Sequence, residues 1–267
     1  MHAHGTDRAP LLPGRHSPER VRPVSAAIGS LVRMAAPRRS SSRAGRSGAA
    51  PGGGTDAPRI DHVDPTGLVD VTGDSLAAHD DRERERLVDA DLADRDLEGV
   101  VLRECVLEAP RLGGARLRGA RFVETVVADS FAPELAAGRS TWHDVRVERP
   151  RWGSAELFDA DWRSVRVVGG KIDYLNLRGA RLTDVVLEGC SIGELDLGGA
   201  EALRVALVDC RVGTLDVTRA SLAHVDLRTT SFDRVDGLDG LRGATVDAVQ
   251  LQALAPALAA HLGLVVD

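Results

Sequence analysis

Cysteine, lysine and aromatic residues are scarce in this sequence of 267 residues. The three cysteines, Cys105, Cys190 and Cys210, are too few and too scattered for a disulfide framework or a CxxC-type zinc site. No apolar run approaches the roughly 20 residues of a membrane helix. The nearest approach to a signal sequence, residues 26–32, is short and ends at Arg33. These absences predict a cytoplasmic protein in a reducing compartment that makes no membrane contact.

Catalytic motifs are absent as well. The eight histidines show no metal-binding spacing such as HExxH, and no GxSxG nucleophile elbow is present. The glycines at 52–54 lack the strand and helix that a phosphate-binding loop needs. His143 and His224 fall on outward positions and are interpreted as solvated surface groups. The sequence therefore predicts no enzyme, and it assigns no catalytic, cofactor-binding or metal-ligating residue and no cofactor.

The first 55 residues differ from the rest in charge. They hold nine arginines against Asp7 and Glu19, a formal charge of +7, which leaves about −13 for the remainder. Because this segment is rich in Arg, Ser, Gly and Pro and has no periodic apolar set, we expect it to be disordered. Direct nucleic-acid or lipid binding is expected only through this basic arm, and an extension without a role is the favoured interpretation. Met34 offers an alternative start.

An apolar residue recurs at every fifth position from Leu87 to Phe232 without a slip. All thirty positions are apolar, and at 43% apolar composition the probability of this by chance is on the order of 10⁻¹¹. A period of five fits neither a strand, at two residues, nor a helix, at 3.6. The positions are Leu87, Leu92, Leu97, Leu102, Leu107, Leu112, Leu117, Phe122, Val127, Ala132, Ala137, Trp142, Val147, Trp152, Leu157, Trp162, Val167, Ile172, Leu177, Leu182, Leu187, Ile192, Leu197, Ala202, Leu207, Val212, Val217, Leu222, Leu227 and Phe232.

A second apolar set, two residues before the first, repeats its own order every four steps. It runs Ala180, Val185, Cys190, Leu195, then Ala200, Val205, Cys210, Leu215. The structural period is therefore twenty residues, made of four fives. A chain that turns a quarter circle every five residues stacks each residue on its equivalent one coil later, and stacked coils share one core. The pattern predicts a solenoid.

Runs such as ADLAD, ARLRG, ARFVE, LNLRG, ARLTD and LDLGG resemble the pentapeptide-repeat family, whose consensus is A(D/N)LXX. The resemblance implies an all-β fold, a right-handed quadrilateral parallel β-helix of about seven coils. The pattern is weakest at residues 128–141, where Ala132 and Ala137 replace large residues and Pro133 and Gly138 intervene. We expect a bulged coil or a protruding loop there. Arginine in place of lysine is typical of a high-GC bacterial genome.

Four regions follow from these patterns. They are the disordered arm at 1–55, an N-terminal cap or linker at 56–84, the pentapeptide-repeat β-helix at 85–234, and a turn with a C-terminal helical cap at 235–267.

The C-terminal cap carries helix signals. Asp247 and Gln250 form a capping-box-like start. We expect Pro256 to break the helix into two pieces, about 247–254 and 256–262, with Gly263 as the stop. Residues 264–266 would then form a short strand.

Two sets of side chains on the predicted solenoid could carry chemistry. Cys190 and Cys210 lie one coil apart at the same interior corner, where a redox pair or thiolate metal site is the alternative to simple core filling. Core filling is favoured because no second ligand type repeats beside them. The tryptophans, Trp142, Trp152 and Trp162, would stack bases only if exposed, and their inward phase favours a core role.

The resemblance also bears on function, because known members that protect DNA gyrase from quinolones present an acidic rod resembling duplex DNA. Duplex DNA carries roughly 21 charges over the expected length of about 36 Å. Residues 85–234 hold 26 acidic against 21 basic residues, a net of −5. The sequence therefore favours a non-enzymatic scaffold that binds an unidentified protein partner through a flat face.

Two other classes of function stay open. A DNA mimic that regulates DNA gyrase is the alternative, and a novel type of enzyme is the least supported. The resemblance also implies a homodimer formed through residues 247–262.

Overall fold

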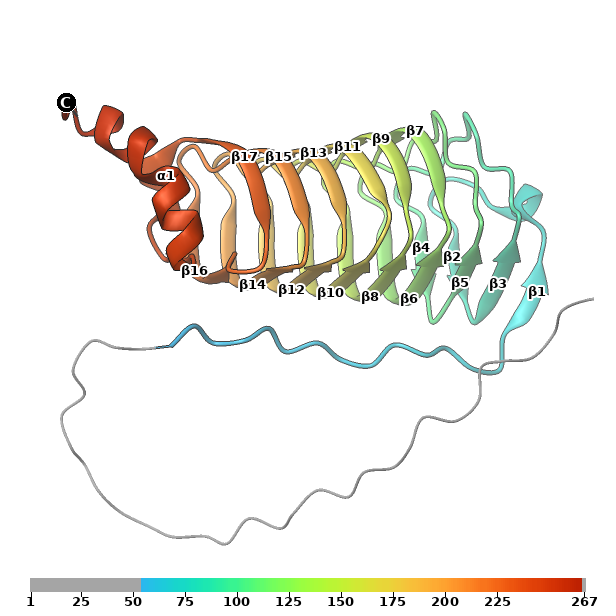
Figure 1. Cartoon of the computed structure of the whole chain (residues 1–267). Coiled ribbons are helices and arrows are strands. Elements are labelled where there is room, and N and C mark those ends of the chain that lie inside the picture. Colours follow the sequence, from blue (N-terminus) through green and yellow to red (C-terminus); the bar gives the residue numbers. More distant parts are fainter. Residues whose placement is uncertain (1–53, 266–267) are drawn as a thin grey trace, which may run out of the picture. The chain divides into compact units, whose positions relative to one another are not determined.

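The computed structural model describes residues 54–265, which form a parallel β-solenoid followed by one helix (Figure 1). Equivalent residues of successive coils pair in parallel, twenty residues apart, as Phe122 pairs with Trp142 and Trp142 with Trp162. The predicted all-β solenoid and its period are confirmed. Residues 1–53, which include nearly all of the predicted basic arm, lie outside the described part.

The coils contribute to two parallel sheets, which we call sheet A and sheet B. Sheet A comprises β1 (Val69–Val71), β2 (Asp81–Glu83), β3 (Glu85–Val88), β4 (Val101–Arg103), β5 (Val106–Glu108), β6 (Arg121–Ala128), β8 (Thr141–Glu148), β10 (Asp161–Val168), β12 (Arg181–Glu188), β14 (Glu201–Val208), β16 (Ser221–Asp226) and β18 (Ala244–Thr245). Sheet B comprises β7 (Phe131–Ala136), β9 (Arg151–Glu156), β11 (Lys171–Asn176), β13 (Ser191–Asp196), β15 (Arg211–Asp216) and β17 (Ser231–Asp236).

The long strands of sheet A cover two sides of each coil because each one bends in the middle. The bend falls on a residue in the left-handed region, for example Asp184 with φ 58° in β12. This conformation costs an L-residue roughly 1–2 kcal/mol, which the packing of two apolar centres per strand offsets. The bends stack into a column that we call the bend column: Glu124, Asp144, Ser164, Asp184, Arg204 and His224.

The core follows the predicted inward phase. The rings of Phe122 and Trp142 are stacked with centroids 4.3 Å apart, and those of Trp142 and Trp162 lie 5.9 Å apart. Trp152 is buried on the sheet B side. All three tryptophans are inside, so their assignment to the core rather than to a base-stacking surface is confirmed.

The bulge expected at residues 128–141 is absent, and that prediction is wrong. Strand β7 pairs with β9 in the ordinary register, with Ala132 opposite Trp152, and Ala132 and Ala137 are fully buried. Trp152 of the next coil stands in register with Ala132 and is also buried, so a small residue in one coil is followed by a large one in the next and the register is kept.

Pro133 fits into this coil because its position donates no hydrogen bond between coils. At the equivalent position two coils earlier, Ala93 gives its N–H to the side chain of Asp91. A proline there removes no inter-coil bond, which is the condition under which strands tolerate proline.

The solenoid extends beyond the predicted limits of 85–234, to about nine turns rather than about seven. At one end β1 pairs with β3, and a short 3₁₀ turn, η1 (Gly73–Ser75), leads to the buried Leu76. At the other end β18 pairs with β16 after a second 3₁₀ turn, η2 (Leu238–Leu241). These end coils break the five-residue phase, so the periodicity could not reveal them.

The C-terminal segment forms one helix, α1 (Ala248–His261), and the predicted division at Pro256 is wrong. Proline removes one intrahelical hydrogen bond, but the alanines around it have the highest helix propensity, and the helix continues through it. The capping box of Asp247 and Gln250 is confirmed, as is the stop, with Gly263 at φ 72°. Among residues 54–265 no helix combines the length and apolarity needed to cross a membrane.

Gln250 joins this helix to the last coil. Its buried side-chain amide donates to the carbonyls of Leu227 and Thr230, at 2.6 and 2.5 Å. Leu254 is buried one turn further along α1. The end of α1 is followed by Leu264 and Val265 in no regular structure, so the predicted terminal strand is not formed by them, and Val266 lies outside the described residues.

Candidate binding surfaces

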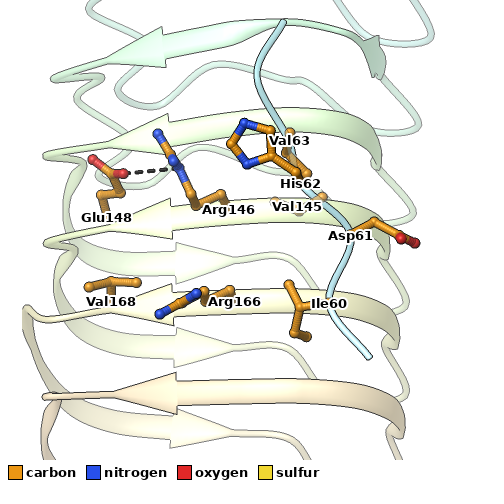
Figure 2. Close-up of a pocket in the computed structure, with 9 residues that line it drawn as sticks. All are labelled: Ile60, Asp61, His62, Val63, Val145, Arg146, Glu148, Arg166 and Val168. Atoms are coloured by element: carbon orange, nitrogen blue, oxygen red, sulfur yellow. Dashed lines mark ion pairs between the residues drawn. The ribbon is translucent and has the colours of Figure 1, made fainter. Parts of the chain in front are cut away.

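An extended segment, residues 55–63, lies across the strands of sheet A along the bend column. We call it the strap, and Figure 2 shows part of it passing over β8 and β10. Within the strap only Val63 is buried. The strap hydroxyl of Thr55 is hydrogen-bonded to that of Thr245 at the last strand.

Backbone N–H groups of the strap donate hydrogen bonds to side chains of the bend column. These bonds do not depend on the strap's own side chains, so the bend column recognises the main chain of an extended segment. The three bonds run from Asp56 N–H to His224 Nδ1 at 3.2 Å, from Arg59 N–H to Asp184 Oδ1 at 2.9 Å, and from Asp61 N–H to Ser164 Oγ at 3.0 Å.

A hollow of about 420 Å³ remains between the strap and sheet A, lined by residues of β8 and β10 and by Ile60 to Val63. Arg146 and Arg166 lie beside each other there on consecutive coils. Each guanidinium already has an acidic partner, since Arg146 lies 2.9 Å from Glu148 (Figure 2) and Arg166 pairs with Glu188. These two arginines therefore offer no uncompensated positive charge to a ligand.

Many charged side chains of the solenoid are paired between neighbouring coils. Residues twenty apart stack on consecutive coils, so these ion pairs favour the correct register between coils and reduce the net charge of the surfaces on which they lie. These pairs are Arg84 with Glu104, Asp96 with Arg116, Asp129 with Arg149, Arg139 with Asp159, Arg181 with Glu201 and Asp184 with Arg204.

The first residues of the sheet B strands form a second kind of column, which we call the cation row. It contains Phe131, Arg151, Lys171, Ser191 and Arg211, together with Arg111 of the coil before β7, in register on successive coils and all exposed. The same register continues to Asp91 on one side and to Ser231 on the other. Lys171 pairs with Asp173 at 2.9 Å. Within residues 54–265, the guanidinium groups of Arg111, Arg151 and Arg211 form no hydrogen bond or ion pair.

The last residues of the same strands form an acidic column, but each carboxylate already has a partner. Asn176 donates to Glu156 at 2.6 Å, and Arg178 lies 2.9 Å from Asp196 and 3.6 Å from Asp216. The final member of the column, Asp236, pairs with Arg234 of its own strand. Sheet B thus carries arginines without ion pairs along one edge and partly neutralised carboxylates along the other.

The sulfur and imidazole groups offer little reactivity. Cys190 and Cys210 are buried free thiols at the predicted interior corner. Their mutual hydrogen bond raises the pKa of the Cys190 thiol and lowers that of Cys210, and burial raises the pKa of Cys105. A reactive thiol must also be accessible, and all three thiols are buried. No group of three or more potential metal ligands occurs among residues 54–265.

The two outward histidines lie at the surface. His224 is exposed, as the sequence predicts, and its Nδ1 also accepts the Asp56 N–H of the strap. His143 is partly exposed and lies 3.7 Å from Asp161. Sequence reasoning missed the strap because residues 55–63 have no periodicity, and nothing in them specifies the side of the solenoid to which they bind.

A family comparison agrees with this geometry. The model described as pentapeptide repeats matches residues 86–122, in eight copies. The chain contains pentapeptide repeats. Beyond the matched segment the same twenty-residue register continues to β15 and β17, whose Arg211 pairs with Ser231. The resemblance drawn from the sequence is confirmed.

Solved structures of two pentapeptide-repeat proteins are also similar. Full-length QnrB1, a plasmid-mediated fluoroquinolone resistance protein, is 19% identical over 72% of this chain and 97% of its own, with a TM-score of 0.29. HetL from the cyanobacterium Nostoc sp. strain PCC 7120, involved in heterocyst differentiation regulation, is 18% identical over 67% and 87%, with a TM-score of 0.31. TM-scores this low say nothing about the partner of this chain. No curated protein matches the sequence.

Proposed function

We propose that this pentapeptide-repeat chain is a non-enzymatic scaffold that binds another protein through a face of the solenoid. The observation that supports this proposal is the strap. The bend column holds the main chain of an extended segment with side chains repeated at each coil, here Ser164 and Asp184. A rigid surface that presents a polar side chain about every 4.8 Å suits an extended or flat partner.

Site-specific photo-crosslinking in the native cell tests the proposal. A photo-reactive residue is placed at Ser191, exposed on sheet B, or at Arg163, exposed on β10 of sheet A. A scaffold gives one repeatable crosslinked protein from one of the two faces, and excess unlabelled chain competes with it. The proposal fails if neither position captures a protein that unlabelled chain displaces.

A DNA-mimic regulator of DNA gyrase is the second candidate, and the acidic column is the observation that favours it. Over the coils from Glu156 to Asp236, about 19 Å, duplex DNA carries roughly 11 charges, against four carboxylates in the column. Arg178, shared by Asp196 and Asp216, and Arg234, beside Asp236, also offset part of this negative charge. The column is therefore a weak imitation of DNA.

A supercoiling assay with gyrase separates the two candidates. A mimic at micromolar concentration inhibits supercoiling or protects the enzyme from a fluoroquinolone, and Asp216→Asn reduces that effect. The matched control is Asp173→Asn, an exposed carboxylate outside the column. Absence of both inhibition and protection removes the gyrase candidate.

We further propose that a homodimer forms through α1. Val249, Leu251 and Leu262 are exposed at its surface, at 74, 52 and 71%. Sedimentation of the full chain tests this, because Leu251→Asp should convert dimer to monomer. Gln252→Asp, a charge at the next and equally exposed position, should not. A monomeric wild-type chain contradicts the proposal.

A further inference from the structure

Among residues 54–265, three arginines of the cation row form no ion pair, and Asp91 is the carboxylate that precedes Arg111 in the same register. Elsewhere an arginine usually meets a carboxylate one coil away, as Arg149 meets Asp129 at 2.7 Å. Keeping Arg111, Arg151 and Arg211 unneutralised in one line creates a strip of positive potential on a chain of net charge −6. Such a strip attracts a narrow, negatively charged partner.

An exposed apolar site lies within the cation row. Phe131 is 48% exposed between Arg111 and Arg151, and it shares an open hollow of about 770 Å³ with Pro133 and Gly153. The absence of a side chain at Gly153 keeps the floor of the hollow flat. Arg151 and Lys171 border it. The strip can therefore receive one apolar side chain with acidic groups around it.

We propose that the cation row binds an extended acidic segment of a partner protein. This inference rests on the proposed scaffold function and names the face and the chemistry of the partner. Carboxylates of the segment pair with Arg111, Arg151 and Arg211, and an apolar side chain lies over Phe131 and Pro133. From Arg111 to Arg211 the row covers five coil steps, about 24 Å, which an extended chain spans with about eight residues.

Nucleic acid fits this face less well. A single strand without sequence preference requires a series of exposed rings for its bases, and the row offers one, Phe131. A duplex is wide, and on this face it would reach from the row to the acidic column at the far ends of the same strands. There it would meet carboxylates such as Asp196 and Asp216. A single extended polypeptide avoids both problems.

The test measures binding of a fluorescein-labelled octapeptide of glutamates with one central photo-leucine to the full chain, by fluorescence anisotropy. The variant replaces Arg111, Arg151 and Arg211 by glutamate. Because exposed ion pairs contribute about 0.2–1 kcal/mol each, we expect the triple reversal to weaken binding about tenfold or more. Illumination should crosslink the photo-leucine to residues around Phe131.

The matched control reverses three exposed arginines that form no ion pair within residues 54–265 and lie outside the cation row, Arg118, Arg121 and Arg163. It changes the net charge equally and keeps the N-terminal arginines, so its affinity should stay within about twofold of the wild type. The corresponding glutamine peptide should not bind. Circular dichroism and melting temperature confirm that both variants fold.

Three outcomes overturn the inference. They are equal weakening by both triple variants, crosslinks confined to residues outside sheet B, and tighter binding of an octathymidylate that depends on the same three arginines. If the cellular crosslinker at Arg163 captures a partner while the acidic peptide fails on sheet B, the scaffold function stands and this inference alone is wrong.

Discussion

Arg204 donates a hydrogen bond to each carboxylate oxygen of Asp184, in the preceding coil, at 2.6 Å. One of these oxygens also accepts the Arg59 N–H of the strap at 2.9 Å. Both side chains are mostly buried, with Asp184 12% exposed and Arg204 17% exposed. The hydrogen bond from Arg204 lowers the pKa of Asp184, burial opposes this, and the bond from Arg59 adds to it. Asp184 thus joins two coils to each other and to the strap.

Asp184→Asn should loosen the strap and destabilise the solenoid. The amide keeps one acceptor but loses the charge, and hydrogen bonds to charged groups contribute about 1.5–3 kcal/mol. Hydrogen exchange of the Arg59 amide should accelerate, and the free energy of unfolding in urea should fall. Asp173→Asn, on the exposed surface of sheet B, is the control. Unchanged exchange at Arg59 would show that the strap does not depend on this carboxylate.

The same pair predicts a pH dependence. Because the pKa of Asp184 is lower in the folded chain than in the unfolded one, its contribution is complete above about pH 4 and is lost as pH falls through the folded-state value. The difference in unfolding free energy between wild type and Asp184→Asn should therefore narrow on acidification. A difference that stays constant from neutral to low pH contradicts this assignment.

Ala160→Ser should stabilise the chain. The indole N–H of Trp142 donates to Ser140 Oγ at 2.8 Å, whereas the buried indole N–H of Trp162 has no partner in the described structure. Ala160 stands before Trp162 where Ser140 stands before Trp142. A serine there supplies an acceptor, with an expected gain of about 1 kcal/mol, or about 2–4 °C in melting temperature.

The control for that substitution is Ala180→Ser. It buries the same hydroxyl at the same corner one coil later, before Leu182, which has no N–H to donate. Calorimetry should show a rise only for Ala160→Ser. Equal shifts in both variants would rule out the indole hydrogen bond as the cause.

Leu182→Asp should unfold the solenoid. Leu182 is 2% exposed, and an aspartate there would bury a charge with no partner. The β signal in circular dichroism and the cooperative melt should both be lost. Thr183→Asp, at the next residue and facing outward, should leave them nearly intact. An unchanged melting temperature for Leu182→Asp would contradict the inward assignment.

Gln250→Ala should detach α1 from the last coil. It removes both donors to the carbonyls of Leu227 and Thr230 and half of the capping box, at an expected cost of about 1–3 kcal/mol. Amide exchange in α1 and β16 should accelerate together. Gln252→Ala, exposed on the same helix, should change neither. Faster exchange in α1 alone would mean that α1 does not protect the backbone amides of the last coil.

The interior of the solenoid was predictable because each buried position has an equivalent twenty residues away. The centres Leu182 and Leu187 and the corner Cys190 follow from spacing alone. Two local predictions were wrong because they relied on a single proline. The sequence predicts an interruption at Pro133, yet that position donates no hydrogen bond between coils. It also predicts a break at Pro256, yet this proline lies among residues that favour a helix.

The outer surface was much less predictable. Arg111, Arg151 and Arg211 are separated by multiples of twenty residues, so their alignment could be derived from the sequence. Their lack of ion pairs could not be derived, because pairing depends on where neighbouring side chains point. The strap is the extreme case. Its bonds use its own main chain, so the identities of Asp56, Arg59 and Asp61 give no sign of its path.

The strap also links its own length to the number of coils between Ser164 and His224. Between Asp56 and Asp61 it advances five residues while the solenoid advances three coils, from His224 to Ser164. At about 3.3 Å per residue and about 4.8 Å per coil, this leaves almost no slack. A duplication that added one coil of twenty residues between Ser164 and His224 would keep the core intact. The strap would then need one or two extra residues to reach both ends. Growth by repeat duplication, the usual way for solenoids to lengthen, is therefore tied to a second change far away in the sequence.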